Sequence, residues 1–236
     1  MVSDNLYSQI KEDLVSCDRM QMLTLAAFGL ERLWRMFDDW TKTEGDPLLY
    51  QKPSSFRQRM RDILDHIWEQ IESKQDINPY EKEFDDFLDF VNASYDEMDA
   101  QDVDMGTGSP LIGEMFSGAV CFFSEREARN YASCCIVSYA EYLSELLYDY
   151  FYDECKKSVS SQEISPRERE KLLDAKIDAA IAEHPLWKEE MERIKHDFAI
   201  VKKDSNSLKS LCERKVEIQQ MNYITKADLT QAQKSL

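Results

Sequence analysis

Hydrophobic residues recur along this chain at helical spacing, and no segment alternates as a β-strand would. In the segment 19–43, apolar side chains follow one another at intervals of four and three residues: Leu23, Ala27, Leu30, Trp34 and Phe37. Ala26, Leu33 and Trp40 widen this stripe, as is typical of a core helix in a bundle. The same periodicity continues through most of the chain.

The pattern predicts an all-α, single-domain bundle of about eight helices with a long central helix. Only 6 Gly and 6 Pro occur in 236 residues, which disfavours a turn-rich β-fold. With the short helices counted separately, the expected helical segments are 3–16, 19–43, 56–73, 80–93, 111–123, 125–155, 166–183, 185–203 and 205–221, and a short one over 226–234. Ala and Cys on the segment 125–155 allow close helix approach, so we expect this helix to be the central one.

Two capping boxes, each a Ser followed three residues later by Glu, mark helix starts. Ser124 and Glu127 open the long helix, and Ser165 and Glu168 open the helix after it, with Pro166 at its first position. We expect one domain over 1–236, with an acidic loop-rich segment 76–110, a Ser-rich linker from Ser158 to Ser161 and a flexible tail over 222–236.

Charge is strongly negative and unevenly distributed. The formal net charge is −17, and residues 76–104 hold eleven acids and one base. The segment 125–155 adds seven acids against two bases, whereas 156–236 carries slightly more bases than acids. Because Lys and Arg supply most nucleic-acid affinity and attract anionic lipid, we expect neither nucleic acid nor membrane as a partner. A basic protein surface is the partner that such a field steers.

The long helix carries an acidic ridge in which acids recur at i, i+4 spacing, flanked by tyrosines that favour protein interfaces. We expect the partner-binding residues to be those of this ridge and of the acidic segment before it: Glu141, Glu145, Tyr148, Asp149, Tyr152, Asp153, Asp85, Asp86, Asp89, Asp96, Asp99, Asp102 and Asp104. A merely solvated face is the alternative interpretation of the same run. If the two acidic segments meet on one face, that face is the expected interface.

No pattern of catalytic or cofactor-binding residues stands out. A di-iron bundle requires Glu-x-x-His motifs, and none of His66, His184 and His196 has an acid three residues before it. The run 96–104 lacks the residue order of an EF-hand loop, and no P-loop or Rossmann fingerprint occurs. Cys134 and Cys135 fall among apolar residues, which favours packing over nucleophilic chemistry. We therefore expect no enzyme activity, no cofactor and no metal.

Two segments are similar to the YjaG-like family of bacterial proteins. They are 25–40, which contains Leu30-Glu31-Arg32, together with 61–69, and the later segment 184–192, which begins His184-Pro185-Leu186-Trp187. This resemblance implies a helical fold over about 15–220 and a bacterial origin. It implies no catalytic residues, and the acidic stretch 76–104 and the tail after Met221 are not clearly part of it.

These observations predict a cytoplasmic binding protein. The N-terminus lacks the basic and apolar regions of a signal peptide, and no run reaches the length of a membrane span. The leading hypothesis is a bacterial immunity protein whose acidic surface neutralises a toxin domain with a basic cleft. The alternative is a self-associating helical scaffold or regulator, with the Tyr-rich helix as a homodimer face.

Overall fold

The computed structural model describes residues 2–43, 53–74, 128–160, 164–203, 207–221 and 229, and every regular element in these ranges is helical. The prediction of an all-α fold is therefore confirmed. The expected helices over 80–93 and 111–123 lie outside the described residues, as do the capping box at Ser124 and the acidic loop-rich segment 76–110. The expected helix over 226–234 and the tail 222–236 also lie outside them, except for Leu229.

Seven α-helices and one 3-10 helix are described, and several begin or end at the predicted residue. They are α1 (Val2–Asp13), η1 (Leu14–Ser16), α2 (Arg19–Thr43), α4 (Pro53–Ser73), α7 (Ala128–Ser160), α8 (Pro166–Glu183), α9 (Pro185–Lys203) and α10 (Leu208–Gln220). The bounds of α2, α8 and α9 agree with the sequence pattern.

Other helix ends differ from prediction for local reasons. The first predicted helix is divided, because its last turn tightens into the 3-10 helix η1. Helix α4 begins at Pro53 rather than at Phe56, and Pro is well suited to a first helical turn. Helix α10 begins after Ser207, whose hydroxyl accepts a hydrogen bond from the Ser210 N–H.

The predicted serine-rich linker is wrong, because α7 continues through Ser160. The Ser158 hydroxyl donates to the Cys155 carbonyl at 2.7 Å, and the Ser160 hydroxyl donates to the Lys156 carbonyl at 2.6 Å. Hydroxyls that bond back to the preceding turn let serines remain in a helix. Serine composition alone was therefore a poor sign of a linker here.

Helix α8 starts at the predicted capping box. The Ser165 hydroxyl accepts from the Glu168 N–H, and the Glu168 carboxylate accepts from the Ser165 N–H at 3.0 Å. Two backbone N–H groups that α8 would otherwise leave unsatisfied are bonded in this way. The Ser165 hydroxyl also donates to this carboxylate at 2.6 Å, and this bond together with that from the Ser165 N–H lowers the pKa of the Glu168 carboxyl below its ordinary value.

Helix α7 is central, as the small residues on it predicted: it packs against α1, α2, α8 and α9. It crosses α2 closely at Gly29. A Cβ atom added at Gly29 would lie 2.0 Å from the carbonyl oxygen of Cys135 in α7, so only glycine fits there. Around this crossing, every side chain from Leu23 to Leu33 is buried.

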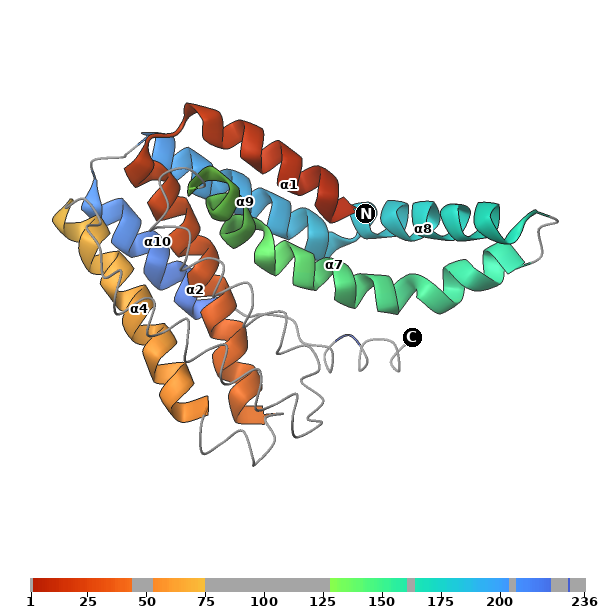
Figure 1. The fold of residues 1–236 in the computed structure, drawn as a ribbon, viewed down its shortest axis with the longest axis horizontal. Coiled ribbons are helices and arrows are strands. Elements are labelled where there is room, and N and C mark those ends of the chain that lie inside the picture. Colours follow the sequence, from red (N-terminus) through yellow and green to blue (C-terminus); the bar gives the residue numbers. More distant parts are fainter. Residues whose placement is uncertain are drawn as a thin grey trace.

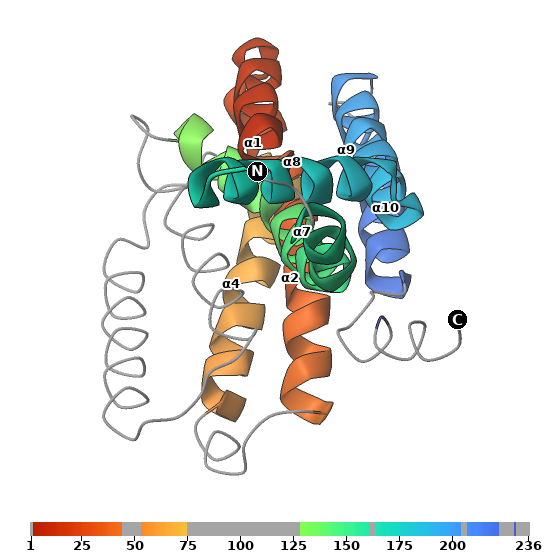
Figure 2. The ribbon, with the colours of Figure 1, turned by 90° about the vertical axis from the view of Figure 1, so that its right-hand side faces the viewer.

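The helices form a body with a projecting arm (Figure 1). Helices α2 and α4 lie side by side in the body, next to α9 and α10, as a second view also shows (Figure 2). The C-terminal half of α7 continues beyond α2 and pairs antiparallel with α8, and we call these two helical segments the arm. Within the described residues, no helix combines the length and apolar character needed to cross a bilayer.

Candidate functional site

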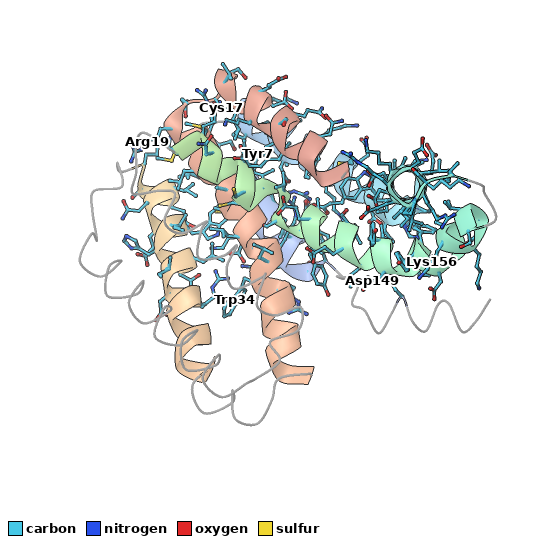
Figure 3. The ribbon with its side chains drawn as sticks, turned by 45° about the vertical axis from the view of Figure 1, so that its right-hand side comes forward. Tyr7, Cys17, Arg19, Trp34, Asp149 and Lys156 are labelled. Atoms are coloured by element: carbon cyan, nitrogen blue, oxygen red, sulfur yellow. The ribbon has the colours of Figure 1, made fainter. Side chains whose placement is uncertain are left out.

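The predicted acidic ridge lies on the arm. Glu145, Asp149 and Asp153 are exposed, and Glu141, nearer the body, is half-buried. Figure 3 shows Asp149 and Lys156 on α7, with Lys156 nearer the tip of the arm. The ridge is therefore accessible over its outer three acids and only partly so at Glu141.

Like charges along the ridge affect its titration. Partial burial and the neighbouring charge of Asp149 both raise the pKa of Glu145 above its ordinary value. Among the described residues, no base forms an ion pair with Glu145 or Asp153. Acids spaced four residues apart on one helix face repel each other by a few tenths of a kcal/mol per pair. A cationic partner would relieve this repulsion.

The two predicted tyrosines are half-buried within the arm. The Tyr148 hydroxyl donates to Asp174 Oδ1 of α8 at 3.0 Å, and the Tyr148 and Tyr152 rings lie 6.0 Å apart. Burial and the contact with Asp174 raise the pKa of Tyr148 to about 12. The Lys156 ammonium lies 5.0 Å from the centre of the Tyr152 ring. Tyr148 thus contributes to the packing of α7 on α8, and each of the two tyrosines lies three residues after an acid of the ridge.

The second predicted acidic segment lies outside the described residues, together with all seven of its candidate residues. They are Asp85, Asp86, Asp89, Asp96, Asp99, Asp102 and Asp104. The ridge on α7 is thus the part of the predicted interface that the structure places.

A group of buried charges, which the sequence pattern did not predict, joins the helices of the body. Arg32 of α2 pairs with Asp197 of α9, and its Nη1 lies 3.7 Å from Glu190 Oε1. Asp197 also accepts from Arg214 Nε of α10 at 2.8 Å. Glu190 lies 3.5 Å from Arg193, its neighbour on α9. We call Arg32, Glu190, Asp197 and Arg214 the buried charge cluster; each is at most 4% exposed.

The charged form of Glu190 is destabilised by its burial in this cluster. Its complete burial raises the pKa of its carboxyl above the ordinary value, and the charges of Arg32 and Arg193 offset this rise only in part. Two of the buried atoms, Glu190 Oε1 and Arg214 Nη2, accept or donate no hydrogen bond within the described part of the chain. A buried polar group left in this state costs about 1–3 kcal/mol.

Glu31, the residue before Arg32, is the centre of a second buried polar group, and its donors come from α4 and α10. The Arg61 guanidinium bonds both carboxylate oxygens at 3.0 Å, Trp68 Nε1 donates at 2.8 Å and Gln219 Nε2 donates at 3.2 Å. Bonds to Asp65 and Glu31 raise the pKa of Arg61, although burial acts in the opposite sense. Two consecutive residues of α2 therefore anchor α4, α9 and α10.

A signal for these charges was present in the sequence. Glu31 falls four residues after Ala27 and three before Trp34, which places it within the apolar stripe of α2. Arg32 lies seven residues after Leu25 and four after Phe28, so these three residues share a second buried face of α2, outside the apolar stripe. A charge inside an apolar stripe requires a buried partner, although the sequence does not indicate which residue supplies it.

Among the described residues, the side chains considered for chemistry make local or packing contacts. The structure describes no cluster of three or more His, Cys, Asp and Glu side chains that would hold a metal ion. His66 lies 3.5 Å from Glu69 on its own helix, and the His184 ring packs against Tyr150 and Phe151. Cys135 is buried at the crossing with α2, which agrees with the predicted packing role, and Cys134 is half-buried. No family model, curated protein or solved structure matches this chain.

Proposed function

We propose that this chain is a binding protein whose acidic ridge on α7 docks onto a basic protein surface, and that its role is immunity against a toxin domain. The observation that carries the proposal is the position of Glu145, Asp149 and Asp153: three exposed acids in one line on the arm. The uneven charge of the whole chain supports the same partner chemistry. Membership of the YjaG-like family stays a hypothesis beside it.

Side-chain hydrogen bonds hold the two helices of the arm together, which favours such docking. Helix α8 is anchored along α7 by Tyr148–Asp174 and by Lys176 Nζ, which donates to the Ser158 hydroxyl at 3.0 Å. A helix that is held in this way presents its acids without first ordering them, which lowers the entropy cost of association. The surrounding negative field speeds the encounter with a basic partner, and salt weakens this effect.

Co-expression with the product of a neighbouring gene tests the proposal. If that product has a basic toxin domain, we expect it to co-purify with this chain at low salt and to dissociate progressively as salt rises. We also expect cells expressing this chain to survive the toxin. The proposal fails if a toxic basic neighbour neither co-purifies nor loses toxicity.

Self-association is the second candidate function, because the arm carries both signs of charge. Helix α8 exposes Arg167 and Lys171 on the same arm whose α7 exposes the ridge. Two arms related by a two-fold axis would place the bases of each on the acids of the other. Light scattering distinguishes the two functions: a stable homodimer of the isolated chain favours self-association, and a monomer favours a heterologous partner.

A further inference from the structure

A cavity of about 240 Å³ lies where the ends of four helices meet in the body. It is lined by Asp18, Met20, Gln21 and Thr24 at the start of α2, Ile71 and Lys74 at the end of α4, Val201 of α9, and Leu208 and Leu211 of α10. None of these residues belongs to α7 or α8, so the cavity is separate from the arm. It is therefore a second place at which the chain can bind a molecule.

The cavity has an apolar floor and a charged mouth. Ile71, Val201 and Leu211 are at most 6% exposed and form the floor, whereas Asp18 and Lys74 are exposed and carry opposite charges at the mouth. A few polar groups around an apolar depression is the usual composition of a small-molecule site. Opposite charges beside an aliphatic floor match a zwitterion that has an aliphatic side chain.

The polar groups of the lining are held in place by their own bonds. Asp18 Oδ1 accepts from the Gln21 N–H at 2.8 Å, and Gln21 Oε1 accepts from the Asp18 N–H at 2.9 Å. Asp18 Oδ2 takes part in none of the hydrogen bonds among the described residues, so it can accept from a ligand. The Thr24 hydroxyl donates to the Met20 carbonyl at 2.8 Å and keeps its capacity to accept.

Lys74 has an unusual backbone for a residue with a side chain. It lies directly after α4 with φ of 52°, in the left-handed region, where a residue other than glycine costs roughly 1 kcal/mol or more. This conformation ends α4 where Lys74 lines the cavity, and it places a positively charged residue at the mouth. A ligand carboxylate would gain a charge-assisted contact at this position.

The size of the cavity limits the ligand. A water molecule occupies about 30 Å³, so the cavity holds roughly eight such volumes, which corresponds to about eight or nine non-hydrogen atoms. We propose that the cavity binds a free branched-chain amino acid, with its carboxylate at Lys74, its ammonium at Asp18 and its side chain on Ile71, Val201 and Leu211. Binding there would also tie α10 to the rest of the body.

Calorimetric titration of the full chain with L-leucine tests this proposal. We expect saturable binding, and at least tenfold weaker binding of 4-methylpentanoate, which lacks the ammonium, and of isoamylamine, which lacks the carboxylate. Each analogue loses one charge-assisted contact, and such a contact is worth about tenfold or more. No saturable binding at 20 mM L-leucine, or equal binding of the three compounds, would overturn the proposal.

Two exposed residues of α10 provide a matched pair of variants. Leu208 is 36% exposed and lines the cavity, whereas Val216 is 48% exposed and does not. We expect Leu208→Trp to abolish binding of L-leucine and Val216→Trp to leave it unchanged. Lys74→Gln, which preserves the shape of the mouth, is expected to weaken binding at least tenfold. Equal binding by all three variants, with helical content retained, would show that the ligand does not occupy this cavity.

Discussion

Arg32 of α2 and Asp197 of α9 form an ion pair between two residues that lie 165 positions apart, and solvent reaches neither side chain appreciably. Asp197 is shared, because Arg214 of α10 bonds its other oxygen. One carboxylate thus connects three helices. Since the attraction between buried charges barely offsets their lost hydration, such a group adds little net stability, whereas removing one of its members is costly.

Asp197→Ala is expected to destabilise the fold severely, because it leaves Arg32 and Arg214 buried without their shared counterion. Removing one partner of a buried pair costs about 3–5 kcal/mol. Urea denaturation followed by circular dichroism measures this loss. Glu192→Ala is the matched control: Glu192 is 72% exposed in its pair with Lys195, and such surface pairs contribute at most about 1 kcal/mol. Equal stability of the two variants would contradict a structural role for the cluster.

Glu190→Gln is expected to change the pH dependence of stability in a defined direction. Because burial raises the pKa of Glu190, the folded protein binds a proton more tightly than the unfolded chain does. This contribution is present below the unfolded pKa, about 4.3, and is lost as pH rises towards the folded pKa. The stability of Glu190→Gln relative to the wild type should therefore increase as pH rises above the unfolded pKa.

Glu168→Gln is the control for this prediction, because it has the opposite sign. The capping bonds lower the pKa of Glu168, so its contribution is present above the ordinary pKa and is lost on acidification. Its stability relative to the wild type should fall as pH rises towards the ordinary pKa and stay constant above it. Parallel pH profiles for Glu168→Gln and Glu190→Gln, measured by urea denaturation, would refute the assignment for Glu190.

Gly29→Ala is expected to destabilise the crossing of α2 and α7, although alanine normally favours a helix. The new methyl group would meet the Cys135 carbonyl at 2.0 Å, and overpacking of this kind costs about 1–3 kcal/mol or more. Ala199→Gly, at an exposed site of α9, is the reference variant. There the exchange of alanine and glycine should change the free energy of unfolding by the ordinary amount, about 1 kcal/mol. Thermal unfolding compares them, and a Gly29→Ala variant with a raised Tm would show that the helices can separate without cost.

Helix periodicity predicted most of the fold because its signals are local. The apolar stripe of α2 and the capping box at Ser165 each lie within one helix, so their bounds could be derived without knowing the neighbours. The partners of Glu31 and Arg32 could not be derived in this way, since they come from α4, α9 and α10. The half-burial of Tyr148 has the same origin: its partner, Asp174, lies 26 residues away on α8.

Local spacing also predicted part of the candidate site, and long-range contacts determine the rest. Charge spacing placed Glu145, Asp149 and Asp153 on one line of a helix, and the structure confirms that they are exposed. Spacing could not show that Glu141 is half-buried, which follows from where α7 enters the body. The cavity beside Lys74 was beyond prediction for a related reason, because its lining comes from the ends of four helices.

The claim that the ridge on α7 is the partner-binding surface is tested most directly by comparing two variants of equal net charge. One is Glu145→Gln, Asp149→Asn and Asp153→Asn, which neutralises the ridge. The control is Glu12→Gln, Asp13→Asn and Glu213→Gln, which neutralises three exposed acids outside α7 and α8. The measured quantity is the association rate with the co-purifying basic partner at low salt.

We expect the ridge variant to associate at least tenfold more slowly than the wild type, since local charges steer the encounter. The control variant should stay within about twofold of the wild-type rate, and only the ridge variant should lose protection against the toxin. Equal rates for the two variants would contradict the account, because they would show that total charge, and not the ridge, governs binding.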